Sequence, residues 1–193
     1  MNRITLSVLL VVSLCACQKQ STMRTASSAT VPRAATTTIE NFETGTKTAY
    51  AAANVTLSTG VWNFNDALLG NLSTDRKNGT QSARVRNSGT ITMQFDIAGG
   101  VTSVSVQHAV FGSDGSSTWQ LWYSTNGGSS FVQAGSTVTT SSTTLQTATF
   151  TLSVTGNVRF QLRKTDGSSN RINFDDFTVN GSGYGGGGTS GGK

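Results

Sequence analysis

Residues 90–97 have the sequence Thr-Ile-Thr-Met-Gln-Phe-Asp-Ile, in which polar and apolar side chains alternate without a break. This two-residue period is typical of a β-strand that buries one face and exposes the other to water. Gly99 and Gly100 then provide a turn, after which the alternation resumes over residues 104–110. The stretch therefore predicts consecutive half-buried strands joined by a short turn.

The same period continues through the rest of the chain. Further strands are expected where the inward-facing residues are Trp119, Leu121 and Tyr123; Phe150, Leu152 and Val154; Val158, Phe160 and Leu162; and Ile172, Phe174, Phe177 and Val179. Short Gly, Asn and Ser turns separate these segments, such as residues 126–128, where Asn and Gly accept a positive φ at low cost. This spacing indicates an all-β fold, an antiparallel jelly-roll β-sandwich of eight to ten strands, rather than a parallel α/β sheet.

The composition agrees with an exported β domain. Charged residues make up 12% of the 193-residue chain, against a typical value of about 25%. Nine Phe, three Trp and three Tyr argue against a disordered chain, and a single Pro and the lack of long helix-forming runs argue against helices. The net charge is +5, but Lys and Arg are scattered, which is weak support for nucleic-acid binding.

The N-terminus has the features of an export signal. A short cationic start precedes an apolar run over residues 4–14, which is too short for a membrane span of about 20 residues. Leu14-Cys15-Ala16-Cys17 resembles a bacterial lipobox, which implies cleavage before Cys17 and acylation of its thiol. The alternatives are an ordinary signal peptide cut nearby or a simple anchor. We expect a protein of the cell envelope, lipid-anchored to the outer membrane or cell surface, or a secreted one.

Four segments follow from this pattern. Residues 1–16 are the predicted lipoprotein signal peptide, 17–38 a flexible tether, 39–181 the β-sandwich and 182–193 a Gly-rich tail. The tail is either a disordered terminus or a linker toward a further domain. Both cysteines lie at the end of the signal, so no disulfide is expected inside the domain, which must be held by packing, with or without a metal ion.

Residues at the two ends of the sandwich carry a family resemblance. The opening segment 39–45, IENFETG, and the closing segment 171–179, RINFDDFTV, resemble the jelly-roll modules of bacterial adhesins, MAM domains and carbohydrate-binding modules. A closer resemblance is to an accessory domain of secreted Bacteroidetes nucleases of the endonuclease I or non-specific DNA/RNA endonuclease type. The segments that carry this closer resemblance are residues 46–50, 75–79, 117–128 and 157–160. Together the resemblance covers roughly residues 39–181.

The resemblance implies a structural calcium ion where the first and last strands meet. Carried over, its ligands would be Glu43 and one or both of Asp175 and Asp176, with backbone carbonyls near residues 79–82. Carboxylates and carbonyls are ligands that calcium prefers. Because adjacent strand residues face opposite ways, a bulge would be needed for both aspartates to reach one ion. The alternative is that these acids form turn hydrogen bonds or face solvent.

A binding face is predicted from the outward positions of three segments. Trp122 lies opposite the apolar face of its strand, Arg159 and Arg163 lie opposite the core of theirs, and Arg84 and Arg86 flank Val85 in the same manner. If these strands share the outer sheet, an indole would be surrounded by guanidinium and amide groups. Such a surface suits sugar rings or nucleobases, and uronates or phosphates. The alternative is that Trp122 packs under a loop and the arginines are merely solvated.

No catalytic residue is predicted. His108 is the single histidine and shares a face with Val104 and Val106, so a satisfied interior or edge imidazole is expected. One histidine does not build a zinc site, and Asp175 and Asp176 are adjacent on a strand and splay apart, unlike the carboxylate pair of a glycosidase.

The sequence therefore predicts an exported, lipid-anchored, non-catalytic binding or adhesion module. Its expected ligand is a polysaccharide or a nucleic acid, and its membrane contact is the lipid on Cys17. Two alternatives stay open. The chain is the N-terminal accessory part of a secreted nuclease whose catalytic domain lies beyond Lys193, or it is a structural protein of the cell surface.

Overall fold

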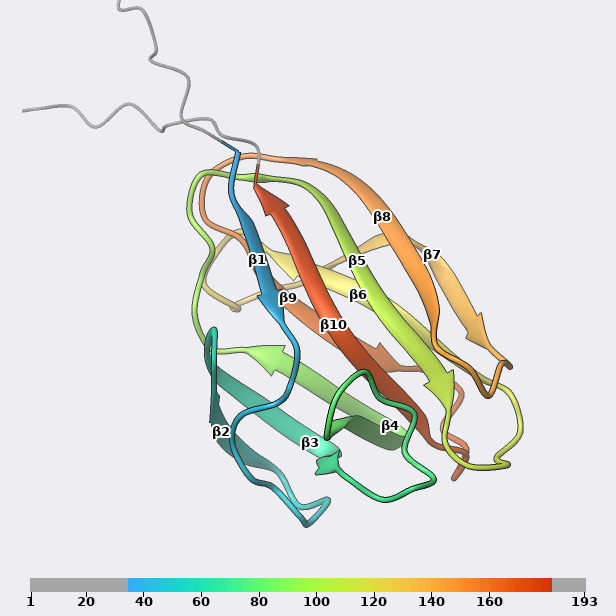
Figure 1. The fold of residues 1–193 in the computed structure, drawn as a ribbon. Coiled ribbons are helices and arrows are strands. Elements are labelled where there is room, and N and C mark those ends of the chain that lie inside the picture. Colours follow the sequence, from blue (N-terminus) through green and yellow to red (C-terminus); the bar gives the residue numbers. More distant parts are fainter. Residues whose placement is uncertain (1–34, 182–193) are drawn as a thin grey trace, which may run out of the picture.

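The computed structural model describes residues 35–181, which form ten β-strands (Figure 1). In chain order the strands are β1 Thr37–Glu40, β2 Ala53–Leu57, β3 Gly60–Gly70, β4 Ser82–Met93, β5 Val101–Val110, β6 Ser117–Ser124, β7 Val132–Thr140, β8 Gln146–Val154, β9 Arg159–Lys164 and β10 Ile172–Gly181. Among these described residues, no helix is both long and apolar enough to cross a membrane.

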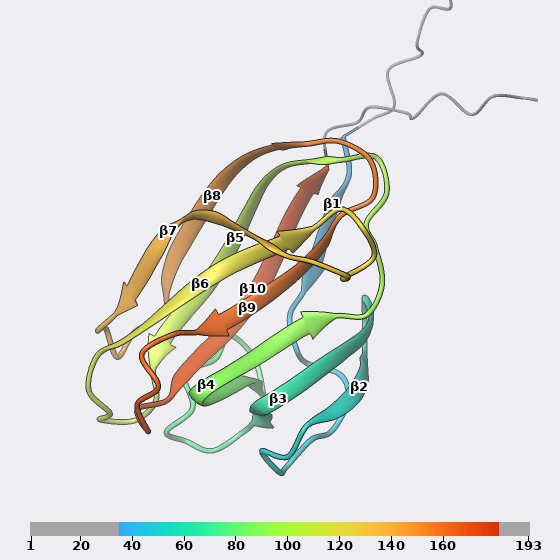
Figure 2. The same cartoon turned by 180° about the vertical axis from the view of Figure 1, so that it is seen from behind.

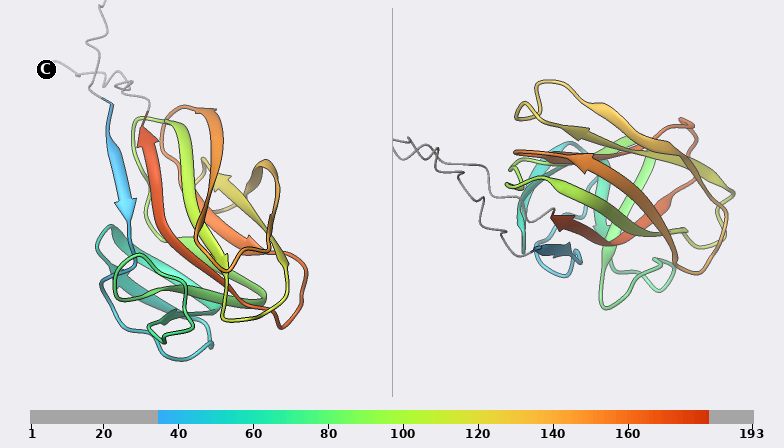
Figure 3. Two further views of the ribbon diagram at one scale, coloured as in Figure 1. Left: turned by 45° about the vertical axis from the view of Figure 1, so that its right-hand side comes forward. Right: turned by 90° about the horizontal axis from the view of Figure 1, so that it is seen from above.

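The strands are arranged in two layers that face each other. One layer contains β1, β10, β5 and β8 (Figure 1), and the other contains β2, β3, β4, β9, β6 and β7 (Figure 2). The strand pairs are antiparallel, and β4 hydrogen-bonds to both β9 and β10, which links the layers. Figure 3 shows the same two layers from the side and from above. The predicted all-β antiparallel β-sandwich is confirmed.

The first and last described strands lie side by side. β1 pairs with β10 from Thr37 opposite Asn180 to Glu40 opposite Phe177 (Figure 1). β1 thus begins inside the segment predicted to be the tether. The signal peptide, the lipidation site Cys17, most of the tether and the Gly-rich tail lie outside the described residues.

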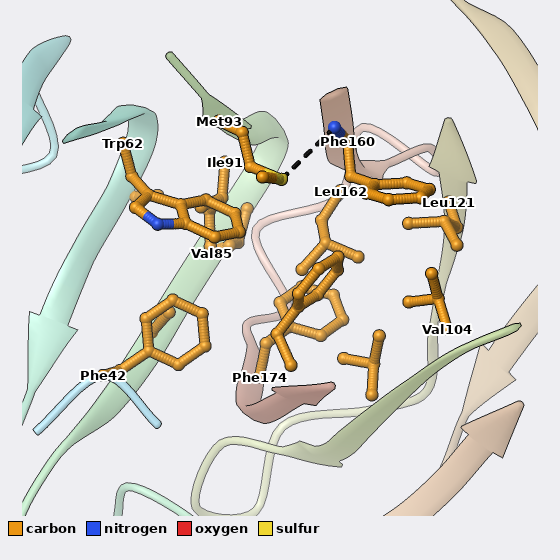
Figure 4. Packing of buried hydrophobic residues seen from close by; sticks show 14 of the residues in the cluster. Phe42, Trp62, Val85, Ile91, Met93, Val104, Leu121, Phe160, Leu162 and Phe174 are labelled. Atoms are coloured by element: carbon orange, nitrogen blue, oxygen red, sulfur yellow. Dashed lines mark hydrogen bonds between the residues drawn. The ribbon is translucent and has the colours of Figure 1, made fainter. Parts of the chain in front are cut away.

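Two tryptophans organise the core between the layers. Trp62 packs edge-on against Phe42, Phe95 and Phe177, with ring centroids 5.4 to 6.1 Å apart. Trp119 forms a second cluster with Phe150 and Phe174 and is itself fully buried. Figure 4 shows the packing around Trp62, in which the apolar faces of β3, β4 and β9 meet. Aromatic pairs in these orientations contribute about 0.5–1.5 kcal/mol each beyond area burial.

The strand that was predicted over residues 90–97 differs at both ends. β4 begins at Ser82 and ends at Met93. Beyond Met93 the chain leaves the sheet, yet Phe95 still packs against the core. Ile97 forms only an isolated bridge with Val158. The alternation marked which side chains face the core, but not where sheet hydrogen bonding stops.

Candidate binding surface

β6 and β9 are neighbours, as the predicted binding face requires. Trp122 on β6 lies directly opposite Gln161 on β9. The buried residues of both strands, Leu121 and Leu162 among them, point into the core, so Trp122 and Gln161 share the outer face of the sheet.

A row of polar side chains continues from this pair across the whole layer. Directly opposed residues of neighbouring strands project on the same side of a sheet. The row, which we call the outer row, consists of Gln133, Trp122, Gln161, Thr92, Asn63 and Asn54 on β7, β6, β9, β4, β3 and β2. Its members are joined in part, since Gln161 Nε2 donates to Thr92 Oγ1 at 2.6 Å and Asn63 Nδ2 to Asn54 Oδ1 at 2.8 Å.

Arg163 covers the indole of Trp122. Its guanidinium carbon lies 4.0 Å from the ring centroid of Trp122 and 5.6 Å from that of Phe131. Arg163 Nε donates to Gln161 Oε1, and Trp122 Nε1 donates to Gln120 Oε1 at 2.9 Å. We call the Trp122–Arg163 stack with Gln120 and Gln161 the outer platform. The indole of the platform therefore supports an arginine rather than presenting a bare ring.

The charge of Arg163 is not neutralised within the described residues. Ion pairs to carboxylates are formed by Arg84, Arg86, Arg159, Lys164 and Arg171, but Arg163 forms none in residues 35–181. Burial lowers the pKa of Arg163, but a guanidinium stays protonated in proteins. The outer platform consequently holds a positive charge that an anionic group of a ligand would pair with.

Arg159 lies on the same face of β9 but is already paired. Its Nε contacts Asp96 Oδ1 at 2.8 Å, in a pair that is partly open to solvent. The arginine stands opposite Ser124, at the end of β9. It therefore contributes a neutralised pair to the rim of the platform, not a free cation.

Arg84 and Arg86 lie on β4 in the same layer and have partners other than Trp122, and Arg86 stacks on Tyr50 at 3.9 Å. Arg84 is 8% exposed, pairs with Asp75 at 3.2 Å and lies 4.6 Å from the ring centroid of Phe111. The pairing of β4 with β3 is interrupted between Val85 and Thr90. On its other side the first half of β4 pairs with β10 and the second half with β9, so the arginines and Trp122 lie beside different strands.

The three predicted calcium ligands meet around one loop. Asp175 Oδ2 accepts from Asn78 N at 2.8 Å, and Asp176 Oδ2 from Asn78 Nδ2 at 2.9 Å. Glu43 accepts from Thr80 N at 3.0 Å. A bulge is present at this point, with a register shift after Asp175 and a φ of 41° at Asp176. We call Glu43, Asp175 and Asp176 the acidic cluster.

Asp175 is an incompletely compensated buried carboxyl. Burial, together with the negative charges of Asp176 and Glu43, raises the pKa of Asp175 to about 7, against the hydrogen bonds that it accepts. Burial also acts to raise the pKa of Glu43. The hydrogen bonds from Thr80 and Gln81 outweigh this effect, so the pKa of Glu43 is lowered.

The oxygen atoms of the acidic cluster are of the kind that binds calcium, although in this structure they accept hydrogen bonds from N–H groups. Gln81 Nε2 donates to three carbonyl oxygens beside Glu43, those of Phe42, Thr44 and Gly45. These oxygens converge as calcium ligands do. In residues 35–181, however, no three acids, histidines or cysteines are arranged to hold a metal. The calcium ion stays a prediction.

His108 occupies the interior position that was expected for it. Its side chain is 6% exposed, its Nδ1 lies 2.7 Å from Thr140 Oγ1, and its ring packs edge-on against Trp119 at 5.3 Å. Burial lowers the pKa of His108, which favours the neutral imidazole. The histidine stabilises the packing of Trp119, which belongs to β6.

Solved structures with a similar fold include an adhesin domain and carbohydrate-binding domains. The K2 cleaved adhesin domain of Lys-gingipain matches 74% of this chain and 97% of its own length, with a TM-score of 0.57 at 15% identity. The CBM22-1 xylan-binding domain of Paenibacillus barcinonensis Xyn10C matches 77% and 96%, with a TM-score of 0.52 at 12% identity. A family 29 carbohydrate-binding module matches 78% and 92%, with a TM-score of 0.50 at 12% identity.

The jelly-roll fold is shared with adhesin and carbohydrate-binding domains. This confirms that part of the resemblance; identities this low show the fold alone. No protein-family model matches the chain, and no curated protein matches it either. The kinship with nuclease accessory domains stays a prediction.

Sequence reasoning missed the amides of the outer row. Asn54, Asn63 and Gln133 belong to β2, β3 and β7, which the sequence analysis did not locate. The available signal was weak: Asn63 lies between Trp62 and Phe64 in a short alternating run, and Gln133 lies in a mostly polar segment.

Proposed function

We propose that this domain is a non-catalytic binding module that takes an acidic polysaccharide on the outer platform and along the outer row. The observation that carries the proposal is Arg163, which is stacked on Trp122 and has no carboxylate partner within residues 35–181. A guanidinium recognises a carboxylate with two parallel hydrogen bonds, and uronate residues supply that carboxylate.

The shape of the surface favours a long ligand over a small one. The outer row crosses β7, β6, β9, β4, β3 and β2. Five inter-strand spacings of about 4.8 Å give a length of about 24 Å. The amide side chains along it both donate and accept hydrogen bonds, which matches the hydroxyl groups of a sugar chain.

The names of the structural neighbours support the same class of function. One neighbour is described as an adhesin domain, another as a xylan-binding domain. A shared fold does not by itself transfer a ligand, so the residues of the platform carry the proposal.

The test is retention on polygalacturonate, xylan, mannan and duplex DNA by affinity electrophoresis. We expect retention on polygalacturonate, and a loss of about tenfold in affinity for Trp122→Ala and Arg163→Gln. Thr151→Ala, on exposed β8 in the opposite layer, is the matched control and should bind as the wild type does. Unchanged retention of both platform variants would overturn the proposal, as would retention on DNA alone.

We also propose that Cys17 is acylated and holds the domain at the cell envelope. The support is the sequence around Leu14–Cys17 with its preceding apolar run. In the producing cell, the wild-type chain should be found in the membrane fraction and Cys17→Ser in the soluble fraction. Mass spectrometry of the N-terminal peptide would show the lipid directly, and an unmodified Cys17 would contradict the proposal.

Calcium binding at the acidic cluster is proposed as a structural role. The support is the buried, raised-pKa Asp175 beside Glu43 and three converging carbonyl oxygens. Glu43 and Asp175 would hold the ion, which would supply positive charge to this end of the sandwich.

A further inference from the structure

A hollow of about 320 Å³ lies among loops at one end of the sandwich, apart from the outer platform. It is formed where the β5–β6 and β9–β10 loops come together beside β4 (Figure 1). The residues that define it, which we call the loop hollow, are Tyr50, Arg86, Asn87, Asp114, Asn170 and Arg171. Its volume is at the low end of the range of about 300–1,000 Å³ that is usual for ligand pockets.

The walls of the loop hollow are held in place by stacking and ion pairs. Arg86 stacks 3.9 Å above the ring of Tyr50. Arg171 stacks 3.9 Å above Phe111 and makes a bidentate pair with Asp114, with both contacts at 2.8 Å. Asp114 also accepts from the backbone N of Arg171 at 2.8 Å. Side chains fixed in this way lose little entropy when a ligand binds.

Hydrogen bonds hold Asn87, which lines the hollow, in its conformation. Asn87 has a φ of 50° and its neighbour Asp66 a φ of 47°, in the left-handed region that Asn and Asp adopt more readily than other residues with a side chain. Asn87 N donates to Ser168 O at 3.0 Å, and Asn87 Nδ2 reaches Asp66 Oδ2 at 3.4 Å. These contacts fix the side of the hollow that Asn87 forms.

The charges of the loop hollow select a neutral ligand. Arg86 is paired with Asp66 and Arg171 with Asp114, so each guanidinium has its own carboxylate. The Arg171 hydrogen bond lowers the pKa of Asp114 against the effect of burial, which keeps that carboxylate an acceptor. In contrast to Arg163, these arginines leave no unpaired charge for an anionic group.

The polar side chains that line the hollow include both hydrogen-bond donors and acceptors. Guanidinium groups only donate, a carboxylate only accepts, and the amides of Asn87 and Asn170 do both. A ring that carries several hydroxyl groups complements this mixture, because each hydroxyl both donates and accepts. We propose that the loop hollow is a second binding site, which takes one neutral sugar residue independently of the outer platform.

The test is a ¹H–¹⁵N NMR titration of the full chain with D-glucose, D-galactose, D-mannose and D-xylose, with D-galacturonate as the charged comparison. We expect at least one neutral sugar to shift the resonances of Asn87, Asn170 and Arg171 with millimolar affinity, and galacturonate to bind there about fivefold more weakly or less. No saturable shift with any of the four sugars would overturn the proposal, and so would equal or tighter binding of galacturonate.

Two variants locate the site. Ser169→Trp fills the hollow from an exposed position and should weaken the sugar by about tenfold, and Asn170→Ala should weaken it in the same direction. Wild-type affinity in both variants would overturn the proposal. Trp122→Ala should leave the hollow resonances and their affinity unchanged. Since the platform has its own resonances, failure at the hollow is distinguishable from failure of the proposed function.

Discussion

Trp119 and Trp122 lie three positions apart on β6, so their side chains face opposite sides of the sheet and have different roles. Trp119 is fully buried, packs against Phe174 at 4.9 Å and donates from Nε1 to Thr140 Oγ1 at 3.0 Å. Trp122 points outward and packs against Arg163. A bulge between Trp119 and Leu121 in the pairing with β7 accompanies this arrangement.

Equal substitutions at these two positions should have unequal effects on stability. Trp119→Ala is expected to lower the free energy of unfolding by about 3–5 kcal/mol, because it empties a closed part of the core. Trp122→Ala is expected to lower it by about 1 kcal/mol or less, chiefly through the lost stack with Arg163. Urea denaturation measures both. Similar losses for the two variants would contradict the assigned faces.

Asp166 gives a prediction of pH dependence. Burial opposes its ionisation, but hydrogen bonds from Lys164, Ser117 and Ser168 prevail and lower its pKa from 3.8 to about 2. A lowered carboxyl pKa stabilises the fold above pH 3.8, and this stability is lost as the pH falls toward 2. Asp166→Asn should therefore be less stable than the wild type at neutral pH and equally stable near pH 2. A constant difference across this range of denaturation curves would refute the assignment.

At the scale of the element, β4 changes its pairing partner along its length. Gly89 lies in its middle, where an added Cβ would stand 2.6 Å from Asp66 O and 2.8 Å from Arg86 O. Backbone atoms at this distance do not give way without moving the chain. The pairing of β4 with β3 is interrupted here, between Val85 and Thr90; the part of β4 before it also pairs with β10, and the part after it with β9.

Gly89→Ala should consequently lower the free energy of unfolding by about 1–3 kcal/mol, as overpacking does. Ser88→Ala, at the neighbouring position, is the control and should change it by less than about 0.5 kcal/mol. Thermal melting compares the two. If Gly89→Ala melted like Ser88→Ala, the close approach of the backbone would not be required.

The acidic cluster connects the bulge of β10 with the loop at residues 78–81. If calcium binds there, saturation at about 100 times its dissociation constant should add about 2.7 kcal/mol of stability. Asp175→Asn should abolish the rise in melting temperature, and magnesium, which demands a tighter octahedral site, should produce less of it. No rise with calcium and no fall with EDTA would remove the metal from this account.

Alternation in the sequence predicted β5, β6, β9 and the inward faces of β10, because each carries apolar residues at every second position. It missed β7, whose residues are mostly exposed and polar, since an edge strand needs few apolar side chains. The period of a strand gives the face of a residue, but the neighbouring strand depends on where a bulge divides the chain.

At the scale of the whole molecule, the first and last described strands meet and the candidate sites stand apart. β1 and β10 are paired, with Thr37 opposite Asn180, so the first and last residues of the sandwich lie at the same end (Figure 1). The outer platform lies on the opposite layer, formed by β6 and β9.

The charge of the platform has a consequence for the intact protein. Binding through Arg163 should weaken as salt is raised, since an exposed ion pair is screened over about 8–10 Å at physiological ionic strength. Binding of neutral sugars to the loop hollow should hardly change, because its arginines are paired internally. Calorimetric titrations with oligogalacturonate and with a neutral sugar at low and high salt compare the two. Identical salt dependence would contradict the assigned charges.

The three tryptophans permit one measurement that tests the central claim directly. Trp62 and Trp119 are buried, whereas Trp122 lies on the outer platform, so the indole N–H resonances report the core and the surface separately. In an NMR titration of the full chain with oligogalacturonate, we predict a saturable shift of the Trp122 indole resonance while those of Trp62 and Trp119 stay in place. Binding that leaves the Trp122 resonance unmoved, or no binding at all, would contradict the account.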